Sequence, residues 1–197
     1  MANKNEYVIH PQTIILYLVL GGITMLFLGF TVAYMYNRVQ FGLQSVALPN
    51  LFYFNTLILI LCSFLFTKTK RAYLDDDTAL YQKLLWATLA CTLLFLLLQV
   101  LAWLQLKAMN SHLIEGNMTT YLYALSGLHF AHVIAGIPFL CRFLYVAHFR
   151  MKEPVSVLVY FADPYKKRSL DLLSTYWHYL DLLWIFLVLF FLLNYLI

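Results

Sequence analysis

Five long, uninterrupted apolar stretches constrain this chain more than any other feature of its sequence. A helix needs about 20 apolar residues to cross a hydrocarbon core of roughly 30 Å. A membrane β-barrel is disfavoured, because its strands alternate in polarity over about ten residues whereas these stretches are continuous. The sequence therefore predicts an all-α, polytopic membrane protein. We expect a single domain over residues 1–197, with five transmembrane helices in a bundle at about 12–36, 50–67, 84–106, 121–147 and 172–196.

The composition excludes most other classes of protein. Hydrophobic residues make up 63% of the chain and charged residues 11%, against roughly 45–50% and 25% in soluble domains. Such a chain could not cover a water-exposed surface, so a soluble enzyme, a disordered chain, a secreted disulfide module and a nucleic-acid binder are all excluded. Cys62, Cys91 and Cys141 fall inside apolar stretches, which predicts small core residues and neither disulfides nor a metal cluster.

Lysine and arginine are distributed unequally between the two sides that five spans define. Cytoplasmic loops of membrane proteins carry the excess of these residues. We therefore expect the N-terminus and the second and fourth connections in the cytoplasm, and the C-terminus outside. The cytoplasmic side holds Lys4, Lys68, Lys70, Arg71, Lys83, Arg142, Arg150, Lys152, Lys166, Lys167 and Arg168, and the other side holds Arg38 and Lys107.

Two histidines lie inside the fourth span, where polar groups are costly and mark candidate functional sites. His129 and His132 are three residues apart, on neighbouring parts of one helix face. They could ligate a haem or a metal, or they could form hydrogen bonds across a helix interface. We favour the structural interpretation, because two histidines on one helix do not bracket a haem.

Small residues on two spans predict helix-packing surfaces. Close approach of membrane helices depends on Gly and Ala at the contact. The predicted packing positions are Gly22, Gly29, Gly127, Ala131 and Gly136.

The fifth span begins with a cluster of aromatic and ionisable residues. His178 and Asp181 are three residues apart, so that they can pair and partly neutralise the cost of burying each other. Trp177 and Trp184 share a helix side with Asp181. A proton relay through His178 and Asp181 is one interpretation, and a structural anchor near the membrane face is the one we favour.

The connections contain fewer candidates. Asp75, Asp76 and Asp77 predict a solvated turn before a helix, or alternatively a proton-collecting patch. The 148–171 connection contains an apolar run at 155–161, which is too short to span and should lie on the bilayer surface or on a neighbouring subunit. In the third span, Gln99 could form a hydrogen bond between helices.

The last two spans together resemble a known family. Residues 126–136 read SGLHFAHVIAG, and residues 176–184 read YWHYLDLLW. These runs resemble TGFHGLHVIIG and YWHFVDVVW of subunit III of the haem-copper oxidases. Asp171 stands seven residues before His178, where the family usually has Glu.

This resemblance implies a five-helix, bacterial-type subunit III in the cytoplasmic (inner) membrane. Such a subunit has no catalytic, cofactor-binding or metal-binding residues, and haem and copper are expected in partner subunits. It packs against subunit I of a cytochrome c or quinol oxidase, with subunit II as a further partner in the complex, binds phospholipid in a cleft, and supports proton uptake. The residues expected at its helix interfaces or lipid cleft are His129, His132, Asp171, Trp177, His178, Asp181 and Trp184.

The chain departs from the family pattern at three places. Ile23 stands where the family often has a buried Glu, and Phe130 replaces a small Gly between the two histidines. The 148–171 connection is longer than usual, and we expect it to contact an additional partner such as another respiratory complex.

Two other functions are weighed against subunit III. A di-haem b membrane anchor needs about four axial histidines in facing pairs, and only His129, His132 and His178 lie clearly within spans, with His148 near an end. A small transporter should show interrupted helices in matching halves. Pro138 is the only proline well inside a span, which ranks the transporter last.

Overall fold

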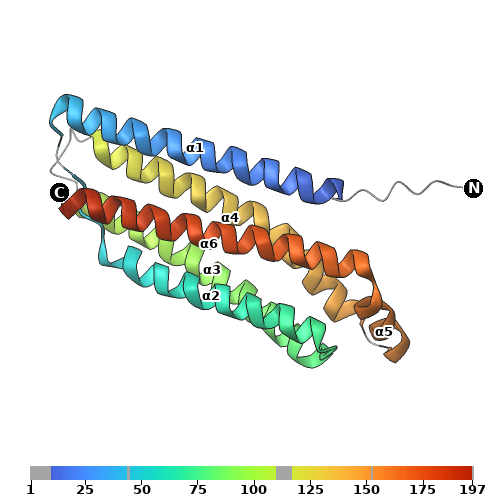
Figure 1. Cartoon of the computed structure of the whole chain (residues 1–197). Helices are drawn as coiled ribbons and strands as arrows, with labels where there is room; N and C mark the ends of the chain where they lie inside the picture. The colour runs from blue at the N-terminus through green and yellow to red at the C-terminus, as the bar shows by residue number, and fades with distance from the viewer. Residues whose placement is uncertain (1–9, 44, 110–116, 152, 197) are drawn as a thin grey trace, which may run out of the picture.

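A computed structural model of the chain describes residues 10–43, 45–109, 117–151 and 153–196. Within these ranges the chain forms six helices and no strand (Figure 1). They are α1 Pro11–Phe41, α2 Asn50–Leu74, α3 Thr78–Met109, α4 Asn117–Phe149, α5 Pro154–Ala162 and α6 Pro164–Leu196.

Five of the described helices, all except α5, are long and apolar enough to cross a membrane, which confirms the all-α prediction with five spans. The helices extend beyond the predicted spans. Beyond the second predicted span, 50–67, helix α2 continues through four charged or polar residues to Leu74. Helix α6 likewise begins at Pro164, before the fifth predicted span, 172–196. Apolarity marks the part of a helix that faces lipid, whereas backbone hydrogen bonding continues into water.

The bundle is built on a tight hairpin and a central helix. Helices α2 and α3 pack along their length, and α6 contacts α1, α2, α4 and α5. The main contacts of helix α1 are with α4 and α6. It lies on the opposite side of the bundle from α2 (Figure 1). The inner face of α1 carries Ile23, Phe27 and Tyr34, which are buried, while Met25 on its outer face is 74% exposed.

The turn between α2 and α3 is the solvated turn that the three aspartates predict. Asp75 ends α2, and its N–H donates to the carbonyl oxygen of Arg71. Asp76 adopts a left-handed conformation with φ of 55°. The Asp77 carboxylate accepts a hydrogen bond of 2.9 Å from the Leu80 N–H, as a helix-capping aspartate does.

Helix α5 occupies the connection that was predicted to run over 148–171. Because α4 ends at Phe149 and α6 begins at Pro164, the connection outside the long helices is shorter than predicted. Tyr160 packs its ring on Tyr73, whose hydroxyl donates to the Tyr160 carbonyl oxygen at 3.2 Å. Burial raises the pKa of the Tyr160 phenol. The apolar run at 155–161 therefore forms a helix that packs against α2 of the same chain.

The two ends of the bundle differ in charge. The α2–α3 turn, α5 and the start of α6 lie at one end (Figure 1), which carries the described cations of the predicted cytoplasmic side. Arg38 and Lys107 lie in the last turns of α1 and α3, at the other end. Lys4 and Lys152, which were counted in the same prediction, lie outside the described residues. The side of the membrane on which each end lies stays a prediction.

Candidate functional site

Helix α6 positions the aromatic and acidic residues that the sequence singled out. Trp177, Asp181 and Trp184 recur at intervals of four and three residues, so they share one face of the helix. All three are buried, with 3%, 7% and 1% of their surface exposed. This face of α6 is turned into the bundle.

The two tryptophans bind α6 to α2. Trp177 stacks on Phe66, with ring centroids 5.8 Å apart and planes 13° apart. Trp184 stacks on Phe52 at 5.7 Å and 11°. The indole N–H of Trp184 also donates a hydrogen bond of 3.1 Å to the hydroxyl of Thr56. Both side chains therefore act at a helix interface.

His129 lies at the contact between α4 and α6 and is fully buried. Its Nε2–H donates to the carbonyl oxygen of Leu180 at 3.1 Å. Its ring packs against Phe95 and Trp184, with centroids at 5.8 Å and 4.9 Å. His129 therefore contacts both α3 and α6 within the bundle.

His132 points to different neighbours. Its Nδ1–H donates to the carbonyl oxygen of Leu128 at 2.6 Å, and its ring centroid lies 6.0 Å from that of Phe27 on α1. The hydroxyl of Tyr176 donates to the His132 carbonyl oxygen at 2.8 Å. Among the described residues, no group of three or more His, Cys, Asp or Glu side chains could hold a metal ion.

His178 and Asp181 are brought together with two hydroxyl groups of α2. His178 Nδ1 lies 2.8 Å from the Ser63 hydroxyl and 3.7 Å from Asp181 Oδ2. Its Nε2 lies 3.5 Å from the Thr67 hydroxyl. The predicted pairing thus exists, but the shortest contact of the imidazole is with Ser63. Ser63 was missed because a serine inside an apolar run carries no pattern.

Asp171 lies apart from this group, nearer the charged end of the bundle. Its carboxylate forms an ion pair of 2.7 Å with Lys70, and the two side chains are 42% and 40% exposed. A partly exposed pair of this kind contributes about 0–1 kcal/mol to stability. It joins α6 to the part of α2 that extends beyond the predicted span.

The residues of the predicted small-residue surfaces differ in their neighbours within this chain. A Cβ atom added at Gly22, Gly29 or Gly127 would meet nothing within 4 Å, and Ala131 is exposed. No other helix of this chain therefore approaches the Cα atoms of these three glycines closely, and their packing role stays a prediction. Gly136 differs from them, since an added Cβ would lie 2.9 Å from Trp177 Cζ3 at the contact between α4 and α6.

Buried amide and thiol groups join α2 to α3. Asn55 donates a hydrogen bond of 2.9 Å to the side-chain oxygen of Gln99, and both residues are fully buried. The Cys62 thiol contacts the Thr92 hydroxyl at 3.4 Å. The interhelical hydrogen bond expected of Gln99 is therefore present, and its partner Asn55 was missed.

A cleft of about 570 Å³ opens between α1, α4 and α6 at the charged end of the bundle. Its walls are mainly apolar, with Leu16, Phe139 and Leu172 among them, and Tyr160 of α5 contributes to its lining. Arg142 and Lys166 bring two cations to it. The sequence contains one indication of this site. Arg142 is the only Lys or Arg inside the predicted fourth span, 121–147.

Comparison with known proteins identifies one family. The family model described as cytochrome c oxidase subunit III matches residues 13–195, which include nearly all of the five long helices. No curated protein matches the chain.

Proposed function

Because the chain belongs to the cytochrome c oxidase subunit III family, whose model matches residues 13–195, we propose that it is the non-catalytic subunit III of a respiratory haem-copper terminal oxidase. The proposed complex is of the cytochrome c oxidase type and acts in aerobic electron transport and proton pumping. The family match over all five spans carries this proposal. The proposed location is the cytoplasmic membrane of a bacterium, with the N-terminus in the cytoplasm.

The proposed role of the chain is to pack on subunit I, beside subunit II, and to stabilise the catalytic part of the complex. Its outward faces suit this role, because large apolar side chains such as Leu57 and Leu97 are 63% and 62% exposed on α2 and α3. Most of the polar side chains of α6 and α4 that the sequence singled out make contacts within the bundle, as described above. They therefore serve its architecture in this proposal.

We propose that the cleft between α1, α4 and α6 holds a phospholipid. Apolar walls accommodate acyl chains, and Arg142 and Lys166 offer the cations that a phosphate group prefers. Replacing both cations, as Arg142→Gln with Lys166→Gln, should lower the amount of phospholipid that the purified complex retains. Lys107→Gln, at the other end of the bundle, is the control. Lipid mass spectrometry measures the difference, and equal retention in both variants would exclude this site.

Support of proton uptake is the remaining part of the proposed function. Asp75, Asp76 and Asp77 are exposed at the charged end, where they could collect protons. Neutralising all three should slow proton uptake by the assembled complex. Unchanged uptake would show that these residues only form the turn.

The di-haem anchor remains the alternative, and the contacts of its candidate ligands do not favour it. His129 donates its Nε2–H to a carbonyl, and its ring is enclosed by Phe95 and Trp184. Purification of the tagged chain in mild detergent separates the two functions. We expect a larger membrane subunit with a haem-copper spectrum to co-purify. A Soret band from the isolated chain would overturn the proposal.

A further inference from the structure

A strip of polar side chains runs along the outer junction of α2 and α6, and we name it the α2–α6 seam. It consists of Ser63, Thr67 and His178, which are joined by the contacts described above, and the buried Asp181 carboxylate lies beneath His178. Thr67 is exposed on α2, and the His178 side chain is 38% exposed. The seam therefore presents hydrogen-bonding groups on the surface of the bundle, where a membrane-spanning chain otherwise presents apolar side chains.

The predicted bounds of the second and fifth spans, 50–67 and 172–196, place the seam within the hydrocarbon core. The apolar part of α6 begins at Leu172, six residues before His178, and a rise of 1.5 Å per residue places the imidazole about 9 Å inside that level. Ser63 lies five residues from Lys68, or about 7.5 Å by the same rise. Long lysine and arginine side chains can reach the headgroups from such a depth, but a histidine side chain is too short to do so.

The hydrogen bonds of His178 leave one side of its ring poorly satisfied. Nδ1 is engaged by the Ser63 hydroxyl at 2.8 Å. Nε2 has only the long contact of 3.5 Å with Thr67, whose hydroxyl also donates to the Ser63 carbonyl oxygen at 3.0 Å. Polar groups within a membrane usually face a bundle interior or pair with a partner. Contact between lipid chains and a partly exposed imidazole with a weakly hydrogen-bonded nitrogen is therefore energetically unfavourable.

Apolar side chains flank the seam on both helices. Phe64 of α2 is 55% exposed and Leu182 of α6 is 67% exposed. Since Leu182 is four residues after His178, the two side chains lie on one face of α6. An apolar surface with a polar strip at its centre is typical of the face by which membrane helices associate, where packing gives contact and hydrogen bonds give register.

We infer that the α2–α6 seam is a docking face for a transmembrane helix of a partner oxidase subunit, which places a hydrogen-bonding side chain opposite His178 Nε2. The inference rests on the proposed function, because it names the face by which the subunit joins its complex. The opposite side of the bundle, formed by the outer face of α1, provides an internal comparison (Figure 1).

Site-specific photo-cross-linking in the assembled complex tests the inference. A benzophenone amino acid replaces Leu182 beside the seam, and in a second variant it replaces Met25, which is 74% exposed on α1. Both complexes are irradiated in their native membrane and the products are identified by mass spectrometry. We expect the probe at position 182 to cross-link to a partner membrane subunit, with several-fold more product than the probe at position 25.

Two outcomes would overturn the inference while leaving the proposed function intact. One is that position 182 yields only phospholipid adducts although the chain co-purifies with the oxidase. The other is that position 25 cross-links to the partner subunit and position 182 does not. If the chain co-purifies with no oxidase subunit, the proposed function itself is wrong and the inference falls with it.

Substitution of the histidine gives an independent measurement. His178→Phe keeps an aromatic ring and removes the hydrogen bond to the partner, whereas His178→Gln keeps a polar group. We expect His178→Phe to weaken retention of the chain in the complex about threefold to tenfold, as the loss of one interhelical hydrogen bond implies. His178→Gln should retain it better. Equal retention of the two variants, with both chains folded by circular dichroism, would contradict the inference.

Discussion

Gly136 is the place where α4 and α6 approach most closely among the glycines that the structure describes. An added Cβ would lie 2.9 Å from Trp177 Cζ3 and 3.1 Å from Tyr176 Cε1. A side chain in a packed interface that gains one carbon atom forces its neighbours to move. The ring of Trp177 cannot retreat easily, because it also stacks on Phe66 of α2.

We therefore expect Gly136→Ala to destabilise the bundle by about 1–3 kcal/mol. Gly127→Ala is the matched control, since its Cβ would meet nothing within 4 Å on the same helix. Helix propensity should make that control neutral or slightly stabilising. Unfolding in bicelles under a steric-trapping assay measures both, and equal effects of the two substitutions would contradict the packing role of Gly136.

The hydrogen bond between Trp184 and Thr56 offers a second prediction at this scale. A double-mutant cycle with Trp184→Phe and Thr56→Val separates the bond from the loss of ring area. Interhelical hydrogen bonds in membranes average about 0.6 kcal/mol, with a maximum of about 1.7 kcal/mol. We expect a coupling energy in that range, measured by the same unfolding assay. A coupling energy of zero would mean that stacking on Phe52 alone holds the indole.

The stability of the helices depends on the residues at their ends as well as on their apolar faces. The turn between α2 and α3 aligns the tightest helix pair of the bundle, and it combines an aspartate cap with a left-handed residue. Asp77→Ala removes the acceptor for the Leu80 N–H and should cost about 1 kcal/mol.

Asp76→Gly is the matched substitution in the same turn, with the opposite expected sign. Glycine adopts a φ of 55° without the steric cost that aspartate incurs. It should therefore leave stability unchanged or raise it slightly. Thermal unfolding in detergent compares the two variants. A loss of stability for Asp76→Gly larger than that for Asp77→Ala would show that the Asp76 carboxylate has a role of its own.

Helix α5 shows how tertiary contacts decide where a short apolar segment lies. Its inner side packs Tyr160 and Phe161 against Tyr73 and Tyr81. Tyr160→Ala should release this contact and increase cleavage of the connection between α4 and α6 by trypsin, since Arg150 and Lys167 lie on either side of α5. Val159→Ala, which is on the exposed side, is the control and should leave the cleavage rate unchanged.

At the scale of the whole molecule, the charge difference between the two ends predicts how the bundle lies in the membrane. We expect a cysteine at Asp76 to react with a membrane-impermeant maleimide only from the cytoplasmic side, and a cysteine at Phe41 only from the outside. Both positions are exposed, at opposite ends of the bundle. A Cys141→Ser background removes the half-buried native thiol. Right-side-out and inverted vesicles give the measurement, and the reverse labelling would contradict the positive-inside assignment.

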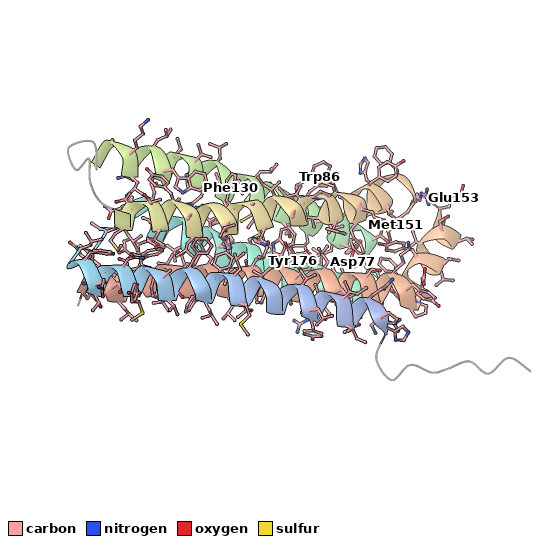
Figure 2. All side chains as sticks on the ribbon, turned by 90° about the horizontal axis from the view of Figure 1, so that it is seen from above. Asp77, Trp86, Phe130, Met151, Glu153 and Tyr176 are labelled. Atoms are coloured by element: carbon pink, nitrogen blue, oxygen red, sulfur yellow. The ribbon has the colours of Figure 1, made fainter. Side chains whose placement is uncertain are left out.

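The places where the chain departs from the family pattern are accommodated by packing within the bundle. Phe130 of α4 does not clash between the histidines, because its ring packs against Trp103 with centroids 5.0 Å apart. Figure 2 labels Phe130 and Tyr176 among the aromatic side chains of the bundle. Ile23, at the position of the family's carboxyl group, is only 7% exposed. A buried apolar residue there leaves this chain without that acid.

The number of helices, their class and the family could be predicted from the residues alone. Continuous apolar runs have one stable form in lipid, because only a helix satisfies every backbone polar group within its own segment. The motifs around His129 and His178 identified the family that the comparison then showed. These properties depend on local composition and order along the chain, which the sequence contains directly.

Which face of each helix is turned inward depended on the tertiary structure. Gly22, Gly29 and Gly127 look equal to Gly136 in sequence, yet only Gly136 lies against a tryptophan. Ser63, Asn55 and Arg142 likewise gained a role only when α2, α3, α4 and α6 came together. Lipid and protein interior are equally apolar, so both sides of a membrane helix carry similar side chains and the sequence does not distinguish them. Packing between neighbouring helices decides which side is buried.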